Sequence, residues 1–147
     1  MNIAIVSTLI IAILNAIYFY DAEATMTKEQ IQKMMNSLGK TCVSKSGVSP
    51  EMQEAHKRRE FPEDRGLKCY FGCMVKMSKV VDKNNKIDVD GTINQMKAFL
   101  PDDIQDSGVD AFCKCYPGAL GFDDLCDIGY HLAKCHYELD SKSYFYP

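Results

Sequence analysis

Two cysteines four residues apart, Cys69 and Cys73, are the first residues whose type and spacing could support chemistry. Such a pair could bind a metal, carry out thiol redox chemistry or form structural disulfides. The Cys-x-x-Cys spacing typical of thiol redox enzymes does not occur in the sequence. Zinc needs four ligands in short paired spacings, and Cys113 with Cys115 could supply a second pair. Whether the protein is secreted into an oxidising environment or stays in a reducing one therefore decides between disulfides and zinc.

The N-terminus predicts that compartment. Residues 3–20 form a nearly continuous apolar run, followed by Ala22-Glu23-Ala24, which has the small-x-small pattern of a cleavage site. The run could instead be a membrane anchor, since about 20 apolar residues span a bilayer, and no Lys or Arg precedes it. The cleavage pattern favours a signal peptide at 1–24 and a single mature domain at 25–147. We therefore expect a secreted, extracellular protein with oxidised cysteines and no membrane-bound segment after cleavage.

Composition narrows the function of this mature chain of 123 residues, which is enough for one domain with a modest core. Removal of Asp21 and Glu23 with the signal leaves 18 acidic residues (20 − 2) against 17 basic ones, a net charge of −1. That balance lacks the basic excess by which proteins bind nucleic acid or anionic membranes. Seven cysteines in a secreted chain of this size indicate three disulfides and one remaining thiol.

Helical periodicity and capping signals run through the mature chain. Thr27 and Gln30 match a capping box, and apolar residues at helical spacing follow. Ser49 before Pro50 predicts a second helix start, and the Leu67–Val81 stretch continues helical spacing through the two cysteines. No segment shows the strict alternation of a half-buried strand. The sequence predicts an all-α fold of about six short helices, with further starts at Asp90 and at Asp123 or Asp124.

Helix geometry limits how the cysteines can pair. Cys69 and Cys73 would lie one turn apart, with Cβ atoms about 5–6 Å apart, whereas a disulfide needs about 3.5–4.5 Å. Each should therefore bond to a different neighbouring helix. Cys126 and Cys135 are nine residues apart and point to opposite sides of one helix. That helix should be cross-linked on both flanks, and the disulfide interpretation is preferred over zinc.

Calcium binding and catalysis find little support. Asp82 and Asn84 begin a stretch that suggests a calcium loop, but Ile87 and Ile93 stand where the glycine turn and the bidentate acid belong. The histidines have no acidic or cysteine partner in a catalytic pattern, and a phospholipase-type site would need both a His-Asp pair and a calcium loop. We expect no metal site, no cofactor and no enzymatic activity.

The cysteine spacing resembles the six-cysteine signature of insect odorant-binding proteins. Cys42 is followed after 26 residues by Cys69, after 3 by Cys73, after about 40 by another cysteine, after about ten by Cys126, and after 8 by Cys135. The three-residue and eight-residue intervals are the specific part, and the match covers the whole mature chain. The ending CHYELDSKSYFYP resembles the Lush-like branch of that family.

The resemblance implies pairing of the first cysteine with the third, the second with the fifth, and the fourth with the sixth. These pairs would be Cys42–Cys73, Cys69–Cys126, and Cys135 with either Cys113 or Cys115. Periodicity slightly favours Cys115, because it shares a helical stripe with apolar neighbours. The remaining thiol would be buried and inert or would join two copies, so the protein is expected to be a monomer or a homodimer.

The resemblance also implies an internal apolar cavity. In that family the residue after the sixth cysteine and the C-terminal tail line the pocket; here these are His136, Phe145 and Tyr146. Periodicity adds a set of apolar residues that face inward: Met77, Val80, Ile93, Met96, Leu100, Phe112 and Leu132. If His136 is neutral beside a bound ligand, acidification would charge it and loosen both tail and ligand.

The function implied by the resemblance is reversible carriage of small volatile hydrophobic odorants or pheromones through aqueous lymph to olfactory receptors. The alternative is a secreted hydrophobic-ligand binder outside olfaction, with a role in sequestration or defence. The ligand and the tissue do not follow from the sequence.

Overall fold

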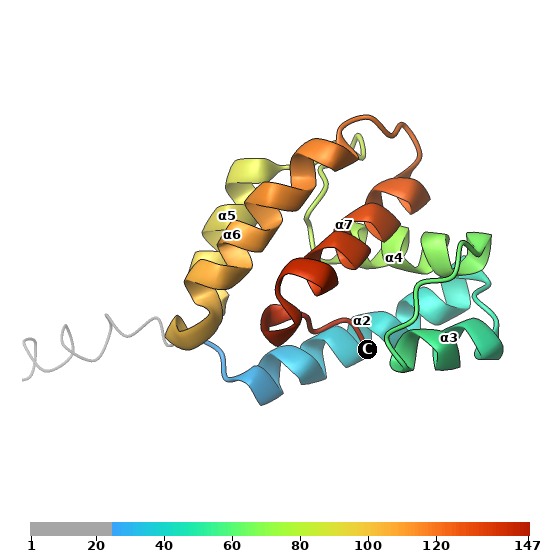
Figure 1. The fold of residues 1–147 in the computed structure, drawn as a ribbon, viewed down its shortest axis with the longest axis horizontal. Coiled ribbons are helices and arrows are strands. Elements are labelled where there is room, and N and C mark those ends of the chain that lie inside the picture. Colours follow the sequence, from blue (N-terminus) through green and yellow to red (C-terminus); the bar gives the residue numbers. More distant parts are fainter. Residues whose placement is uncertain (1–24) are drawn as a thin grey trace, which may run out of the picture.

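The computed structural model describes residues 25–147, so the predicted signal peptide lies outside the described residues. This part of the chain is all-α, as expected, with six α-helices (Figure 1). Its only extended pairing is an isolated bridge between Val81 and Ile87. The helices are α2 (Lys28–Ser46), α3 (Pro50–Lys57), α4 (Arg65–Met77), α5 (Val89–Phe99), α6 (Asp102–Ala119) and α7 (Leu125–Leu139), followed by the 3-10 turn η1 (Ser141–Ser143).

Most helix starts follow the predicted caps. Thr27 forms both bonds of the capping box of α2, and Ser49 caps α3 with Pro50 at its first position. Asp124 caps α7. The prediction of Asp90 as the cap of α5 is wrong, because the carboxylate of Asp88 accepts from the Gly91 backbone N–H at 3.0 Å. The helix α5 therefore begins at Val89, two residues earlier than the sequence predicted.

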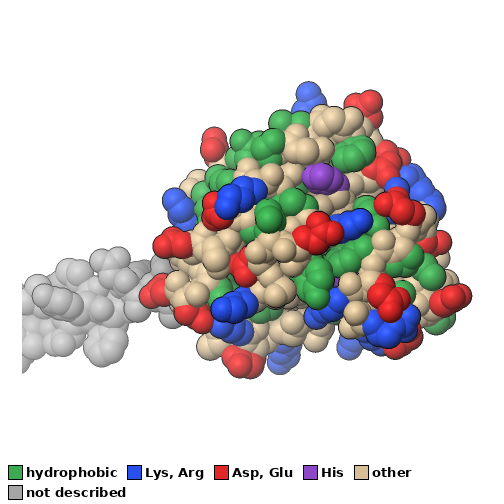
Figure 2. Space-filling model, in the orientation of Figure 1, with side chains coloured by type: hydrophobic (Ala, Val, Ile, Leu, Met, Phe, Trp, Pro, Cys, Tyr) green, Lys and Arg blue, Asp and Glu red, His purple; other side chains and the backbone are tan. Residues whose placement is uncertain are grey.

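The helices form a chain of neighbours. α4 packs mainly against α7, α2 packs on α4, α6 packs on α7, and α5 packs on α6. Figure 1 shows α7 crossing the middle of the molecule, with α5 and α6 on one side and the C-terminus near α2. None of the helices within residues 25–147 is long and apolar enough to cross a membrane. On the face shown in Figure 2, acidic and basic side chains are interspersed.

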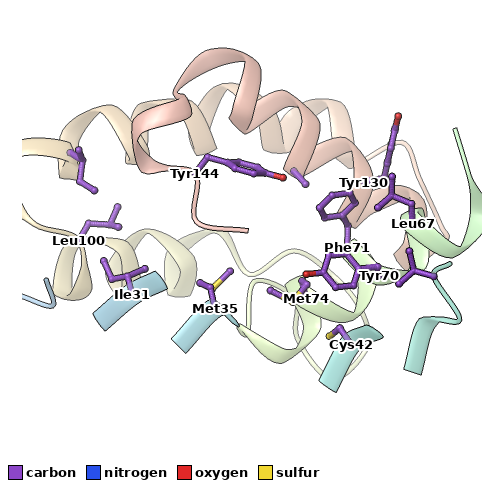
Figure 3. Close-up of a cluster of buried hydrophobic side chains, with 13 residues drawn as sticks. Ile31, Met35, Cys42, Leu67, Tyr70, Phe71, Met74, Leu100, Tyr130 and Tyr144 are labelled. Carbon is purple, nitrogen blue, oxygen red and sulfur yellow. The ribbon is translucent and has the colours of Figure 1, made fainter. Parts of the chain in front are cut away.

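Two connected groups of buried side chains make up the core. One gathers residues of α2, α4 and α7 with Tyr144 of the tail, and Figure 3 shows these side chains converging between the helices. The other lies between the end of α4, α6 and α7 and includes Val75, Phe112 and Leu132. Met96 on α5 packs against both groups. The space around Met96 is therefore where the two halves of the core meet.

The contact between α4 and α7 is made backbone to backbone. A Cβ atom added at Gly72 would lie 2.8 Å from the Leu125 carbonyl oxygen, and one added at Gly129 would collide with the backbone of Phe71 and Gly72. Only glycine lets the two helices approach this closely. The Cys69–Cys126 disulfide joins the same two helices close to this contact.

Gly129→Ala should therefore lower the free energy of unfolding by about 3 kcal/mol or more, because neither backbone can move aside without parting the helices. Gly121→Ala is the matched control, since a Cβ added there meets nothing within 4 Å. Chemical denaturation of the oxidised protein measures both variants. Equal stability of the two variants would show that the close approach of α4 and α7 is unimportant.

Candidate functional site: an apolar cavity under the C-terminal tail

Three disulfides join the helices that pack together. Cys42–Cys73 links α2 to α4, Cys69–Cys126 links α4 to α7, and Cys115–Cys135 links α6 to α7. These are the pairs that the family resemblance implies, with Cys115 as the bonded member of its pair. Cys113 is a free thiol and is half-buried. Residues 25–147 contain no group of three or more His, Cys, Asp or Glu side chains placed to hold a metal ion.

A cavity of about 120 Å³ lies between α5, α6, α7 and the tail. Its apolar wall includes Val80, Met96, Phe112 and Leu132, and Tyr146 of the tail closes it. A second cavity of about 120 Å³ lies between α2, α5 and the tail. The two cavities share Gln95, Met96 and Tyr146, so these side chains form the partition between them: we call the cavities the inner compartment (at Phe112) and the outer compartment (at Ile31).

The structure brings most of the predicted pocket residues to these two compartments. Six line the inner compartment, and Leu100 and Phe145 line the outer one. The six are Val80, Met96, Phe112, Leu132, His136 and Tyr146. Met77 and Ile93 line neither compartment. Met77 packs at the Cys42–Cys73 bridge, with its sulfur 3.5 Å from the Cys42 sulfur, and Ile93 packs into the second core group. Both pack against the core groups, as the periodicity predicts, at places outside the walls of the compartments.

Sequence reasoning missed the polar groups in the inner wall, which are Ser78, Thr92 and Gln95. Ser78 Oγ donates to the Met74 carbonyl at 2.8 Å, and Gln95 Nε2 donates to the Ser78 carbonyl at 3.3 Å. Both interactions stay within the protein: the first closes the end of α4, and the second ties that end to α5. A search for apolar periodicity passes over such residues, because it treats every polar side chain as facing solvent.

His136 is held in one tautomer by the turn that follows α7. Ser143 Oγ donates its single proton to Asp140 Oδ2 at 2.7 Å. The contact of 2.7 Å between His136 Nε2 and Ser143 Oγ must then be a bond that the imidazole N–H donates. Burial lowers the pKa of His136, and the nearby Asp140 carboxylate partly opposes this effect. The imidazole is therefore neutral at pH 7 and lines the inner compartment without a charge.

The tail that closes both compartments is fixed through its backbone. Gln32 Nε2 donates to the Phe145 carbonyl at 3.1 Å, and Arg59 Nη1 donates to the Tyr146 carbonyl at 3.1 Å. The Arg59 guanidinium also lies 5.3 Å from the centre of the Tyr144 ring, a cation–π contact. These bonds hold the aromatic side chains of the tail over the compartments. Burial raises the pKa of Tyr146.

A match to the PBP/GOBP family covers residues 24–138. The chain belongs to the PBP/GOBP family. Among its curated relatives, general odorant-binding protein 72 of Anopheles gambiae is 26% identical over 121 residues, which is 82% of this chain and 99% of the relative. General odorant-binding protein 19a of Drosophila melanogaster is 26% identical over 117 residues, which is 78% of this chain and 80% of the relative.

Solved structures of this family share the fold. Odorant binding protein 4 of Chrysopa pallens superposes with a TM-score of 0.72 at 29% identity, over 84% of this chain and all of that one. Odorant binding protein 7 of Anopheles gambiae, solved with four disulfide bridges and an azo compound, gives a TM-score of 0.63 at 23% identity, over 80% and 91% of the two chains. This second likeness supports the fold alone.

A third hollow in this PBP/GOBP chain lies between α2, α3 and α4 and has a volume of about 340 Å³. Pro147 and His56 are among the residues that line it. His56 is 1% exposed, its Nε2 lies 3.4 Å from the Tyr144 hydroxyl, and its ring meets Phe71 edge to face. Burial, with a smaller effect of Arg59, lowers the pKa of His56 to about 4. The sequence gives no signal for this residue, because it stands in a short polar helix.

The His56 pKa predicts a loss of stability in acid. The unfolded chain binds the proton near pH 6.5 and the folded chain only near pH 4, so stability is complete above the first value and falls between the two. Because of His56, the free energy of unfolding should fall by about 2 kcal/mol when the pH is lowered from 7.4 to 5. His56→Phe should remove this part of the pH dependence of stability. His131→Gln, which leaves His56 and its aromatic neighbours in place, should keep it. Denaturation at both pH values measures the change within each variant. An unchanged pH dependence in His56→Phe would contradict the assignment.

Proposed function

We propose that this protein is a secreted carrier that reversibly binds small volatile hydrophobic molecules, such as odorants or pheromones, and takes them through aqueous lymph to olfactory receptors. The observation that carries the proposal is the pair of apolar compartments beneath a tail that the disulfide-linked helices hold in place. Membership of a family whose matched relatives are named odorant-binding proteins supports it. The proposal assigns binding, without a catalytic step or a cofactor, and includes removal of residues 1–24 as a signal peptide.

The size of the compartments indicates how a ligand would fit. Each holds about 120 Å³, which is below the range of about 300–1,000 Å³ for small-molecule sites. The partition between them is made mostly of flexible side chains, since Met96 has three rotatable bonds and a polarizable sulfur. Rotation of Met96 and Tyr146 would join the compartments into one elongated site. The proposal therefore places an elongated ligand across Met96.

An extended hydrocarbon chain would supply enough affinity for transport. Burying about ten CH₂ groups yields roughly 8 kcal/mol, which corresponds to a dissociation constant of about 1 μM before the costs of association. Such a complex forms at low ligand concentration and still dissociates on a useful timescale. The weak, non-directional contacts of an apolar wall also suit ligands of varied shape.

Met96→Trp should weaken binding of a fluorescent apolar probe and of its volatile competitors by about tenfold or more, because a rigid indole fills the partition. Lys97→Trp is the matched control, since Lys97 is the next residue of α5 and its side chain is exposed. Probe titration and displacement measure affinity, and circular dichroism checks helix content. If the two variants bind alike, the ligand does not cross the partition, and if the wild type binds no apolar probe the carrier function is refuted.

Deleting residues 143–147 should weaken probe binding about tenfold, because Tyr146 walls both compartments and Phe145 walls the outer one. Helix content should remain near that of the wild type, since the deleted segment follows α7 and only the end of η1 is lost. The same titration measures it. Unchanged affinity would show that the tail is no part of the wall, and tighter binding would show that the tail competes with the ligand for its space.

A further inference from the structure

The wall of the inner compartment contains one fully buried hydroxyl group that the fold leaves without a partner. Thr92 lies on α5, is 6% exposed and lines the compartment. Its Oγ1 is buried and makes no hydrogen bond within the described residues. Buried hydroxyls are nearly always paired, because leaving one unpaired costs free energy that an apolar residue would not cost. The Thr92 hydroxyl would therefore gain free energy by bonding to a group from outside the chain.

Three of the other polar side chains of this compartment already donate to acceptors within the protein. Ser78 Oγ and Gln95 Nε2 each donate to a backbone carbonyl, and His136 Nε2 donates to Ser143 Oγ. Thr92 Oγ1 keeps both its proton and its lone pairs available. Thr92 shares the wall of the compartment with apolar side chains, including Val80, Phe112 and Leu132. A hydrogen bond formed there is shielded from water and is stronger than one at the surface.

We propose that Thr92 Oγ1 is the polar anchor of the ligand site, and that the site selects elongated molecules carrying a neutral oxygen at one end, an alcohol or a carbonyl compound. The inference rests on the carrier function proposed above and adds the chemical class of the ligand. The oxygen binds Thr92 in the inner compartment, and the hydrocarbon chain extends past Met96 into the outer compartment. A threonine hydroxyl serves both ligand types, because it accepts from an alcohol and donates to a carbonyl oxygen.

A carboxylate is disfavoured as the anchored group. No Lys or Arg lines the inner compartment, and its one ionisable base, His136, is neutral at pH 7 because burial lowers its pKa. A buried carboxylate needs a partner of opposite charge or several hydrogen-bond donors, and one hydroxyl does not meet that need. The site therefore separates alcohols and carbonyl compounds from fatty acids of the same chain length.

The test uses the secreted, oxidised protein and a set of competitors of equal length. These are a medium-chain primary alcohol, the corresponding aldehyde, the alkane with a methyl group in place of the hydroxyl, and the fatty acid. Displacement of a fluorescent apolar probe gives the dissociation constants for the wild type and two variants. Thr92→Val removes the hydroxyl while keeping the branched shape, and Thr92→Ser keeps the hydroxyl.

Thr92→Val should weaken binding of the alcohol and the aldehyde by about tenfold, or 1.4 kcal/mol, and should leave alkane binding unchanged or tighter. Thr92→Ser should keep most of the preference for oxygenated ligands. Without ligand, Thr92→Val should melt a few degrees higher than the wild type, because it removes a buried hydroxyl that has no partner. This second measurement also shows that the variant folds.

Equal weakening of alcohol and alkane in Thr92→Val would overturn the proposal, because Thr92 would then be only part of the wall. No weakening of either would overturn it as well. A wild type that binds the fatty acid more tightly than the alcohol at pH 7.4 would contradict the neutral-oxygen assignment. If any of these contradicting outcomes occurs while the wild type still binds the probe and the alkane, the carrier function stands and only the role of Thr92 as polar anchor is refuted. If it binds no apolar compound, both proposals fail.

Discussion

The close approach of α4 and α7 is the constraint on which the rest of this structure depends. The glycines at 72 and 129 let the two backbones touch, and the Cys69–Cys126 bond joins the same pair of helices. Two of the other helices that border the compartments, α2 and α6, are attached to this pair by disulfides. Cys42–Cys73 attaches α2 to α4, and Cys115–Cys135 attaches α6 to α7. A shift between α4 and α7 would therefore move both sides of the ligand site at once.

This cross-linked frame lets a small domain keep internal space. Side chains around a void lose packing contacts, and a bundle of this size would gain stability by collapsing onto the two compartments. Each disulfide closes a loop of 20 to 57 residues and stabilises the fold by about 3–4 kcal/mol in the chain-entropy model. The covalent links offset the cost of the compartments while leaving their walls apolar. The stability of the fold and the capacity for ligand thus come from different residues.

The sequence predicted the helices and disulfides better than it predicted the residues that line the compartments. Caps such as Thr27 and Asp124 depend on local geometry, which a sequence shows directly, and the disulfide pairs followed from the resemblance in cysteine spacing. Whether a residue lines a compartment depends on what packs over it: Met77 and Ile93 pack against the core as predicted, yet neither lines a compartment. Periodicity places a residue on a helix face and carries no information about the element packed on that face. Thr92 was missed for a related reason, because its role comes from the absence of a partner, which only the assembled structure reveals.

The two buried histidines give the tail a common dependence on proton concentration. His56 lies against the Tyr144 hydroxyl, and His136 bonds to Ser143, so each contacts the segment that closes the compartments. Burial lowers the pKa of both, which means that the closed arrangement favours the neutral imidazole in both places. Protonation of either histidine therefore costs free energy in the closed arrangement. Asp140 weakens this effect at His136, whereas Arg59 strengthens it at His56, because the guanidinium that holds the tail also disfavours a second positive charge nearby. The two contacts of the tail therefore differ in their electrostatics, because a carboxylate opposes the effect of burial at one histidine and a guanidinium adds to it at the other.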